Sequence, residues 1–299
     1  MDTSVEAFLT QVYVLVDDWC QEPGAALLGG RVGAKPVVSD SEVLTLILAQ
    51  HALGFPTERR WLRYVHHNLR ALFPQQLSQS EFNRRARNLW GALEELRKWV
   101  LVQMEVRPET YRLLDSTPVH VRHWRRHGPG HLRLEGAALG YCAAKRETFY
   151  GYRLLVLTTL DGVITDWTLI PANADEREGA DDMLEEYVNL RVLGDKGFID
   201  GFWQAELQQR QGIVVHTPKR VNQKEQNPPE WDALLNRARR LVETSFAQAK
   251  AFLGLERPGA RTLWGLGSRL RAKLAALTLL AWVNRQAGRS PLTIAGFAC

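Results

Sequence analysis

Apolar positions recur at helical spacing through the first third of the chain. A serine and a glutamate three residues apart begin two of the expected helices, Ser39 with Glu42 and Ser78 with Glu81. This spacing is typical of a capping box, in which both side chains satisfy backbone N–H groups that the first helical turn leaves unpaired. The pattern predicts an all-α region over residues 1–108.

After residue 108 the apolar spacing becomes that of strands. Residues 110–121 predict one strand, and residues 147–172 predict two long strands joined at the Asp161–Gly162 turn. Helices and short strands then alternate as far as residue 254, and a final apolar helix follows. The order predicts an α/β fold, with a mixed sheet of three antiparallel strands followed by parallel strands and helices on both faces.

Length and composition are those of a globular chain. With 299 residues and 45% hydrophobic residues, the chain can bury a sizeable core, and two domains are expected. The longest apolar run, residues 274–283, is too short to span a bilayer, so no membrane partner is expected. Three widely spaced cysteines, Cys20, Cys142 and Cys299, form no disulfide framework and favour a cytoplasmic location.

The net charge of +5 is modest, but arginines cluster with aromatic residues and histidines. This mixture is typical of a nucleic-acid surface, because guanidinium groups bind phosphates and aromatic rings stack on bases; solvated helix faces are the alternative. In the helical region, a helix-turn-helix-like DNA reader and a plain bundle remain equally open. Zinc is disfavoured at the histidines of residues 120–131, since arginines intervene and no cysteine is near. The candidate DNA contacts in these clusters are Arg84, Arg85, Arg87, Arg122, Arg125, Arg126 and Lys219.

Two aspartates interrupt apolar strands that the predicted sheet makes neighbours. Asp115 lies within RLLDSTPVHV, and Asp195 follows the strand in RVLGDKGF. Each alone is better explained as a turn cap, but two adjacent carboxylates would repel each other unless a divalent cation lay between them. Glu243 lies on a late helix with Arg239 four residues before it and Lys250 seven after, so the three share one helix face. Pairing of Glu243 with Arg239 is its structural alternative.

With these carboxylates in this order, the chain resembles the DDE transposases of bacterial insertion sequences, of a compact single-frame type. The matching motifs are LLDSTPV, KRETFYGYRLLVLTTLDG, LGDKGFID and R-x-x-x-E-x-x-x-x-x-x-K, within residues 38–290. The resemblance implies an RNase H-like catalytic domain in which Asp115, Asp195 and Glu243 are catalytic and bind two Mg²⁺ ions, which Mn²⁺ can replace. It also implies that Arg239 and Lys250 contact phosphates.

The chain departs from that pattern in one place. Asn236 stands where many relatives have a tyrosine, which puts a DNA-holding role of that tyrosine in doubt here. The segment between Asp195 and Glu243 is too short for the large β-rich insertion of some relatives.

The resemblance implies metal-dependent phosphodiester hydrolysis at the ends of a mobile element and strand transfer into target DNA. The expected domains are a helical DNA-binding region, 1–108, and an RNase H-like catalytic domain with a C-terminal helix, 109–299. Expected partners are terminal inverted repeats, target DNA and a second copy of the chain, giving at least a dimer on DNA. The alternatives are a nuclease or resolvase of the same fold that cuts without joining, and a DNA-binding regulator without catalysis. The complete acidic triad argues against the regulator, whereas only the resemblance argues against the nuclease.

Overall fold

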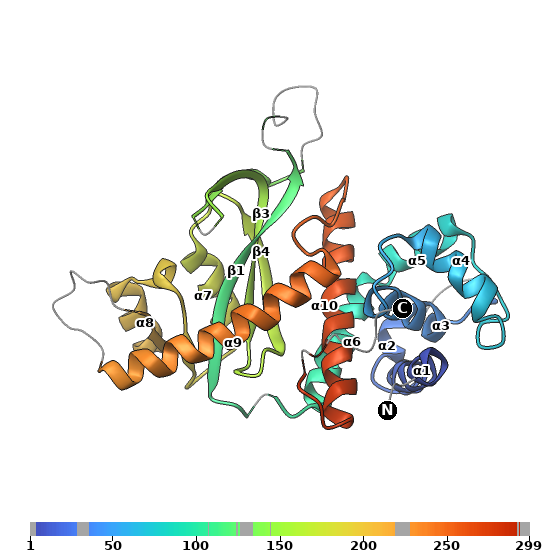
Figure 1. The fold of residues 1–299 in the computed structure, drawn as a ribbon, viewed down its shortest axis with the longest axis horizontal. Coiled ribbons are helices and arrows are strands. Elements are labelled where there is room, and N and C mark those ends of the chain that lie inside the picture. The colour runs from blue at the N-terminus through green and yellow to red at the C-terminus, as the bar shows by residue number, and fades with distance from the viewer. Residues whose placement is uncertain are drawn as a thin grey trace. The chain divides into compact units, whose positions relative to one another are not determined.

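The computed structural model describes residues 4–28, 36–106, 108–123, 125, 134–143, 145–218, 228–291 and 293, without the side chains at 234–235, 238–239, 241–246 and 248–249 (Figure 1). Two compact units divide the chain: Met1–Met104 with Trp264–Cys299, and Glu105–Leu263. In the described part, no helix has both the length and the apolar character needed to cross a bilayer. The functional division at residues 108 and 109 stays a prediction.

The first unit is built of helices. Both predicted serine caps are confirmed: Ser39 Oγ accepts from Glu42 N at 3.1 Å, and Ser78 Oγ accepts from Glu81 N at 3.3 Å. At the first of these caps, Glu42 also accepts the Ser39 N–H at 2.7 Å, which completes a capping box. The helices are α1 (Val5–Gln21), α2 (Ala25–Leu28), α3 (Asp40–Ala52), α4 (Glu58–Asn68), α5 (Gln79–Asn88), α6 (Trp90–Gln103) and α10 (Leu263–Gln286).

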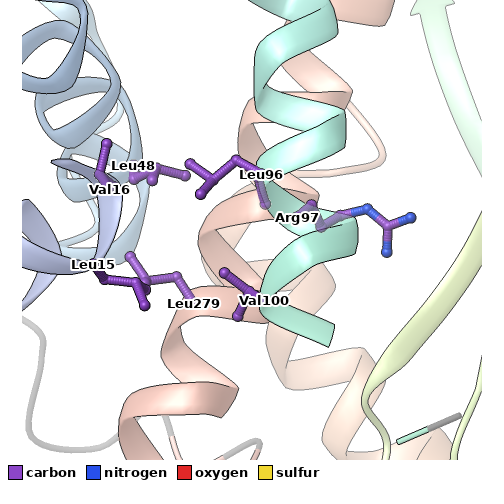
Figure 2. A pocket seen from close by; sticks show the side chains of 8 residues that line it. Leu15, Val16, Leu48, Leu96, Arg97, Val100 and Leu279 are labelled. Carbon is purple, nitrogen blue, oxygen red and sulfur yellow. The ribbon is translucent and has the colours of Figure 1, made fainter. Parts of the chain in front are cut away.

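A small cavity of about 10 Å³ lies in the core of this unit, between α1, α3, α6 and α10. Figure 2 shows aliphatic side chains from these helices around it, whereas the guanidinium of Arg97 points away. Arg97 instead meets the carboxylate of Glu94 at 2.6 Å. A space of this size and lining is a packing gap, because a buried water needs polar partners.

The second unit holds a mixed sheet with helices α7 (Glu176–Leu184), α8 (Gly201–Gln211) and α9 (Pro229–Leu253). β3 pairs antiparallel with β1, β2 and β4, while β5 runs parallel to β1 and β6 parallel to β5. The predicted fold class is confirmed, with one more antiparallel strand, β2, than the sequence suggested. The strands are β1 (Tyr111–Arg122), β2 (Ala138–Cys142), β3 (Glu147–Thr158), β4 (Ile164–Pro171), β5 (Arg191–Leu193) and β6 (Val214–His216).

Helices cover both faces of this sheet, as predicted (Figure 1). On one face, Leu114 and Leu155 pack with residues of α7 and α8 in a single buried cluster. On the other face, Leu113 and Leu193 pack against Trp231 at the start of α9. Because successive side chains of a strand point to opposite faces, Asp115 in β1 lies on the α9 face with Leu113.

Candidate active site

Asp115 and Asp195 lie at the same level of the sheet, where β5 ends beside β1, and this place is called the acidic edge below. The parallel pairing of β1 with β5 runs from Tyr111 opposite Arg191 to Leu113 opposite Leu193. Each aspartate lies two residues beyond the last of these pairs, Asp115 inside β1, which continues to Arg122, and Asp195 in the segment that follows β5. The sheet therefore brings together two of the three carboxylates predicted from the sequence.

Local hydrogen bonds hold both aspartates. Asp195 Oδ1 accepts the Gly197 N–H at 2.7 Å and caps the short 3₁₀ helix η2 (Lys196–Phe198). Asp115, within β1, accepts the Ser116 N–H at 2.8 Å. The turn-cap reading of Asp195 is thus correct locally, and it is compatible with a metal-binding role because a carboxylate has several lone pairs.

Helix α9 crosses β1 (Figure 1). At its start, Trp231 packs on Leu113. Just past its end, Glu256 accepts a hydrogen bond from Thr117 Oγ1 at 3.1 Å, and the Glu256 carbonyl accepts the His120 N–H at 2.7 Å. The two ends of the helix segment are thus tied to β1 on either side of Asp115.

Glu243 lies midway along this segment of α9. Its side chain and that of Arg239 are outside the described residues. Lys250, near the end of α9, is partly exposed. Burial raises the pKa of Glu256, but the hydrogen bond and charge of Lys145 outweigh burial and lower it, and the charge of Lys250 adds a smaller lowering effect. A role of Glu243 as the third carboxylate of the site stays a prediction.

A carboxylate that the sequence did not single out lies beside the pair. Glu176, the first residue of α7, accepts a hydrogen bond from Ser116 Oγ at 3.1 Å and pairs with Arg153 of β3 at 2.7 Å. Burial raises the pKa of Glu176, and the charges of Asp195 and Asp115 raise it further, against the lowering effect of Arg153. Glu176 is therefore close enough to both aspartates to feel their charge.

The donor set and the space around Gly197 fit a divalent cation. Carboxylate oxygens are the ligands that Mg²⁺ prefers. A Cβ at Gly197 would lie 2.9 Å from Asp195 Oδ1 and 3.4 Å from Glu176 Oε2, so glycine keeps the space between these two oxygens open. Among the described side chains, no three acidic, histidine or cysteine residues are grouped closely enough to hold an ion.

A basic groove of about 620 Å³ lies at the far end of β1. Arg122, His123, Arg146 and Arg257 contribute to its lining. The Arg122 guanidinium stacks 4.7 Å from the Tyr150 ring centroid, and its nitrogens are buried without a hydrogen-bond partner in the described part of the chain. The groove therefore carries concentrated positive charge. Among the described residues, no carboxylate pairs with the Arg122 guanidinium.

The predicted DNA contacts of the first unit differ from one another in exposure. Arg84 on α5 is exposed, and Arg87 is partly exposed and stacks on Trp264 at 5.5 Å. Arg85 is only 5% exposed, and it donates to the Val38 carbonyl and to Asp40, both at 2.6 Å. Arg85 is a packing residue, so a direct phosphate contact through its guanidinium is not supported.

The remaining candidates are described only in part. Arg125, three residues past the end of β1, is exposed. Arg126 and Lys219 lie outside the described residues.

The fold and the acidic edge together define an RNase H-like protein of the DDE superfamily. A family model described as "Transposase DDE domain" matches residues 107–279, more than half of the chain, and the chain belongs to this family. No curated protein matches the chain. The family establishes a DNA-binding transposase with DNA-cutting activity, of a kind that generally uses divalent metal ions, and it gives no support to the alternatives.

Proposed function

We propose that the chain cuts DNA at the ends of a mobile element and joins those ends to target DNA, using two Mg²⁺ ions held by Asp115, Asp195 and Glu243. The observation that most supports this proposal is the pairing of β1 with β5, because Asp115 and Asp195 each lie two residues past the last paired leucines, Leu113 and Leu193. The course of α9 over the same point supports Glu243 as the third ligand.

The chemistry consists of two in-line displacements. In the first, water attacks the phosphorus at the element end, and the 3′ oxygen leaves as a hydroxyl. In the second, that hydroxyl attacks a target phosphodiester, so one P–O bond forms as another breaks. Bound divalent ions would activate the attacking oxygen and stabilise the leaving one. The protein supplies rigid placement: Asp115 lies on β1, Asp195 caps the short helix that follows β5, and Lys250 with Arg239 would position the scissile phosphate.

In this proposal, bound DNA would run from Asp115 and Asp195 along β1 to the basic groove. Asp115 and Arg122 are seven positions apart in the strand, roughly 20 Å at ~3.3 Å per residue. A single DNA strand covers that span with a few nucleotides. Arg122, whose guanidinium nitrogens are buried, would act through its charge, whereas exposed Arg125 would contact phosphates directly. The proposed DNA contacts are Arg84, Arg87, Arg122, Arg125, Arg126, Lys219, Arg239 and Lys250.

Two element ends must be paired before joining, and so a dimer or larger assembly on DNA is part of the proposal. The proposed site of action is the cytoplasm, where Cys20 and Cys142, both free thiols, stay reduced.

The test uses labelled fragments of the DNA that flanks the gene on each side, a supercoiled plasmid target and Mg²⁺. Wild type should cut at a defined end and produce plasmid joined to the labelled fragment. Asp195→Asn should do neither while still binding DNA. Cutting without any joined product would favour the nuclease, and cutting by Asp195→Asn at the wild-type rate would place the chemistry elsewhere.

A further inference from the structure

Glu176 is held more firmly than its position at a helix start requires. Arg153 pairs with its Oε1 and also donates to two backbone carbonyls, Ala172 at 3.2 Å and Tyr141 at 2.8 Å. Ser116, the residue after Asp115, donates to the same Oε1. One carboxylate oxygen is thus fixed from β1 and from β3, and the side chain has little freedom to turn.

The other oxygen of Glu176 faces the acidic edge. Oε2 lies 3.4 Å from the Cβ position at Gly197, and Asp195 Oδ1 lies 2.9 Å from the same point. An ion pair that served only to anchor α7 would not need its second oxygen beside another carboxylate. Like charges so close raise each other's energy unless a cation or its water lies between them.

We propose that Glu176 is a fourth acidic residue of the metal centre, a positioning residue that binds the water shell of the divalent ion beside Asp195. The proposal rests on the proposed function, because it takes Asp195 as a metal ligand. Arg153 and Ser116 hold Oε1, which leaves Oε2 to accept a hydrogen bond from metal-bound water.

The chemistry of Mg²⁺ favours this arrangement over direct ligation. The ion loses its water reluctantly and usually keeps several molecules when bound by a few carboxylates. Groups that orient the ligands and waters of a metal from outside typically change its affinity by about 10- to 100-fold.

The test follows how DNA cleavage depends on Mg²⁺ concentration in the full-length protein. Glu176→Gln keeps the size and the Ser116 contact but removes the charge. The Mg²⁺ concentration for half-maximal cleavage should rise about tenfold or more, while the rate at saturating Mg²⁺ stays within a few-fold of wild type. Mn²⁺ binding without DNA, followed by the electron paramagnetic resonance signal of free Mn²⁺, should weaken in parallel. Glu178→Gln, an exposed glutamate of the same helix, is the matched control and should change neither quantity.

Thermal unfolding in EDTA, which removes the metal, tests whether the substitution merely destabilises the fold. If Glu176→Gln is poorly folded, Glu176→Asp keeps the charge and the pairing with Arg153 and should show a smaller shift in the same direction. Unchanged Mg²⁺ dependence and Mn²⁺ affinity in folded variants would overturn the proposal, leaving Glu176 as an anchor of α7. In that result, loss of Mn²⁺ binding by Asp195→Asn would preserve the proposed function, whereas wild-type binding by Asp195→Asn would overturn both.

Discussion

Asp115 and Asp195 each lie two residues past the paired leucines Leu113 and Leu193, Asp115 within β1 and Asp195 just after the parallel strand β5. Hydrogen bonding sets the spacing of the strands that carry these leucines at about 4.8 Å, and the Gly197 N–H holds the Asp195 carboxylate just beyond them. In the proposed function, the two carboxylates act on one bound metal centre. Their contributions to catalysis should therefore depend on each other.

This dependence is testable with single and double asparagine substitutions. Asp115→Asn and Asp195→Asn should each lower single-turnover cleavage by at least about 100-fold, because each removes an anionic ligand. The double variant should lose little more than either single one, since residues that act as a unit are not additive. The measurement is a double-mutant cycle at saturating DNA and Mg²⁺. Losses that multiply would mean that the two aspartates act at separate sites.

The open space at Gly197 gives a second test. A methyl group there would lie 2.9 Å from Asp195 Oδ1, closer than a Cβ tolerates, so Gly197→Ala should displace that carboxylate and slow cleavage. Gly201, the first residue of α8, has no atom within 4 Å of its Cβ position and is the control. Gly201→Ala should cleave like wild type. Equal activity of the two variants would show that the space beside Gly197 is not used.

The sequence predicted those parts of the molecule that depend on local patterns and strand order. The long strands, the Asp161–Gly162 turn and the meeting of Asp115 with Asp195 follow from apolar spacing and from the rules for parallel connections. β2 was missed because it is short, lies at the sheet edge and alternates between partial and full exposure around Gly140. A strand of this kind has no apolar signature.

Glu176 and Arg85 show why side-chain roles were harder to predict. An acidic residue in the first turn of α7 is explained by the helix dipole alone, so this position by itself gives no sign of a further role for Glu176. The available signal was Arg153, a charge inside an otherwise apolar strand, which needs a carboxylate partner from elsewhere in the chain. Arg85 stood among exposed arginines, and only the tertiary contact with Asp40 and Val38 distinguishes it.

Because Arg84 is exposed and Arg85 is buried, substitutions of these neighbouring arginines of α5 should have different effects. Arg84→Ala should weaken DNA binding and lower the slope of log K against log salt by about 0.9, the effect of one lost phosphate contact. Arg85→Ala should reduce the free energy of unfolding of the first unit by about 1–3 kcal/mol, because it leaves a buried carbonyl and Asp40 without their donor. The measurements are binding titrations over a salt series and urea denaturation. If Arg85→Ala were as stable as wild type and lowered the salt slope more than Arg84→Ala, Arg85 rather than Arg84 would be the phosphate contact.

Lys250 should affect chemistry more than binding. Lys250→Ala is expected to slow cleavage of bound DNA by a factor that corresponds to about 1–3 kcal/mol, if a charge-assisted contact to the scissile phosphate is lost. Lys98→Ala on α6, where Lys98 forms an exposed ion pair with Glu95, is the control. Single-turnover cleavage at saturating protein measures the chemical step separately from DNA binding, because all of the DNA is then bound. Weaker binding with normal cleavage of the bound complex would contradict the predicted position of Lys250 near the active site.

The stability of the first unit should depend on pH through His51 on α3. Burial lowers the pKa of His51 from 6.5 to about 3, and the positive charges of Lys273 and Arg269 on α10 lower it further. The folded state therefore keeps His51 neutral where the unfolded chain already binds a proton. The stabilisation is complete above about pH 6.5 and is lost as the pH falls toward 3.

Because His51 keeps some solvent exposure, the expected loss between pH 7 and pH 4.5 is on the order of 1–3 kcal/mol. Amide hydrogen exchange of α3 in the full-length chain measures this free energy locally, after correction for the intrinsic exchange rate at each pH. His51→Gln removes the titrating group at similar size, so α3 protection should depend less on pH in this variant. Equal pH dependence in both proteins would mean that carboxylates elsewhere in the unit, rather than His51, control its acid sensitivity.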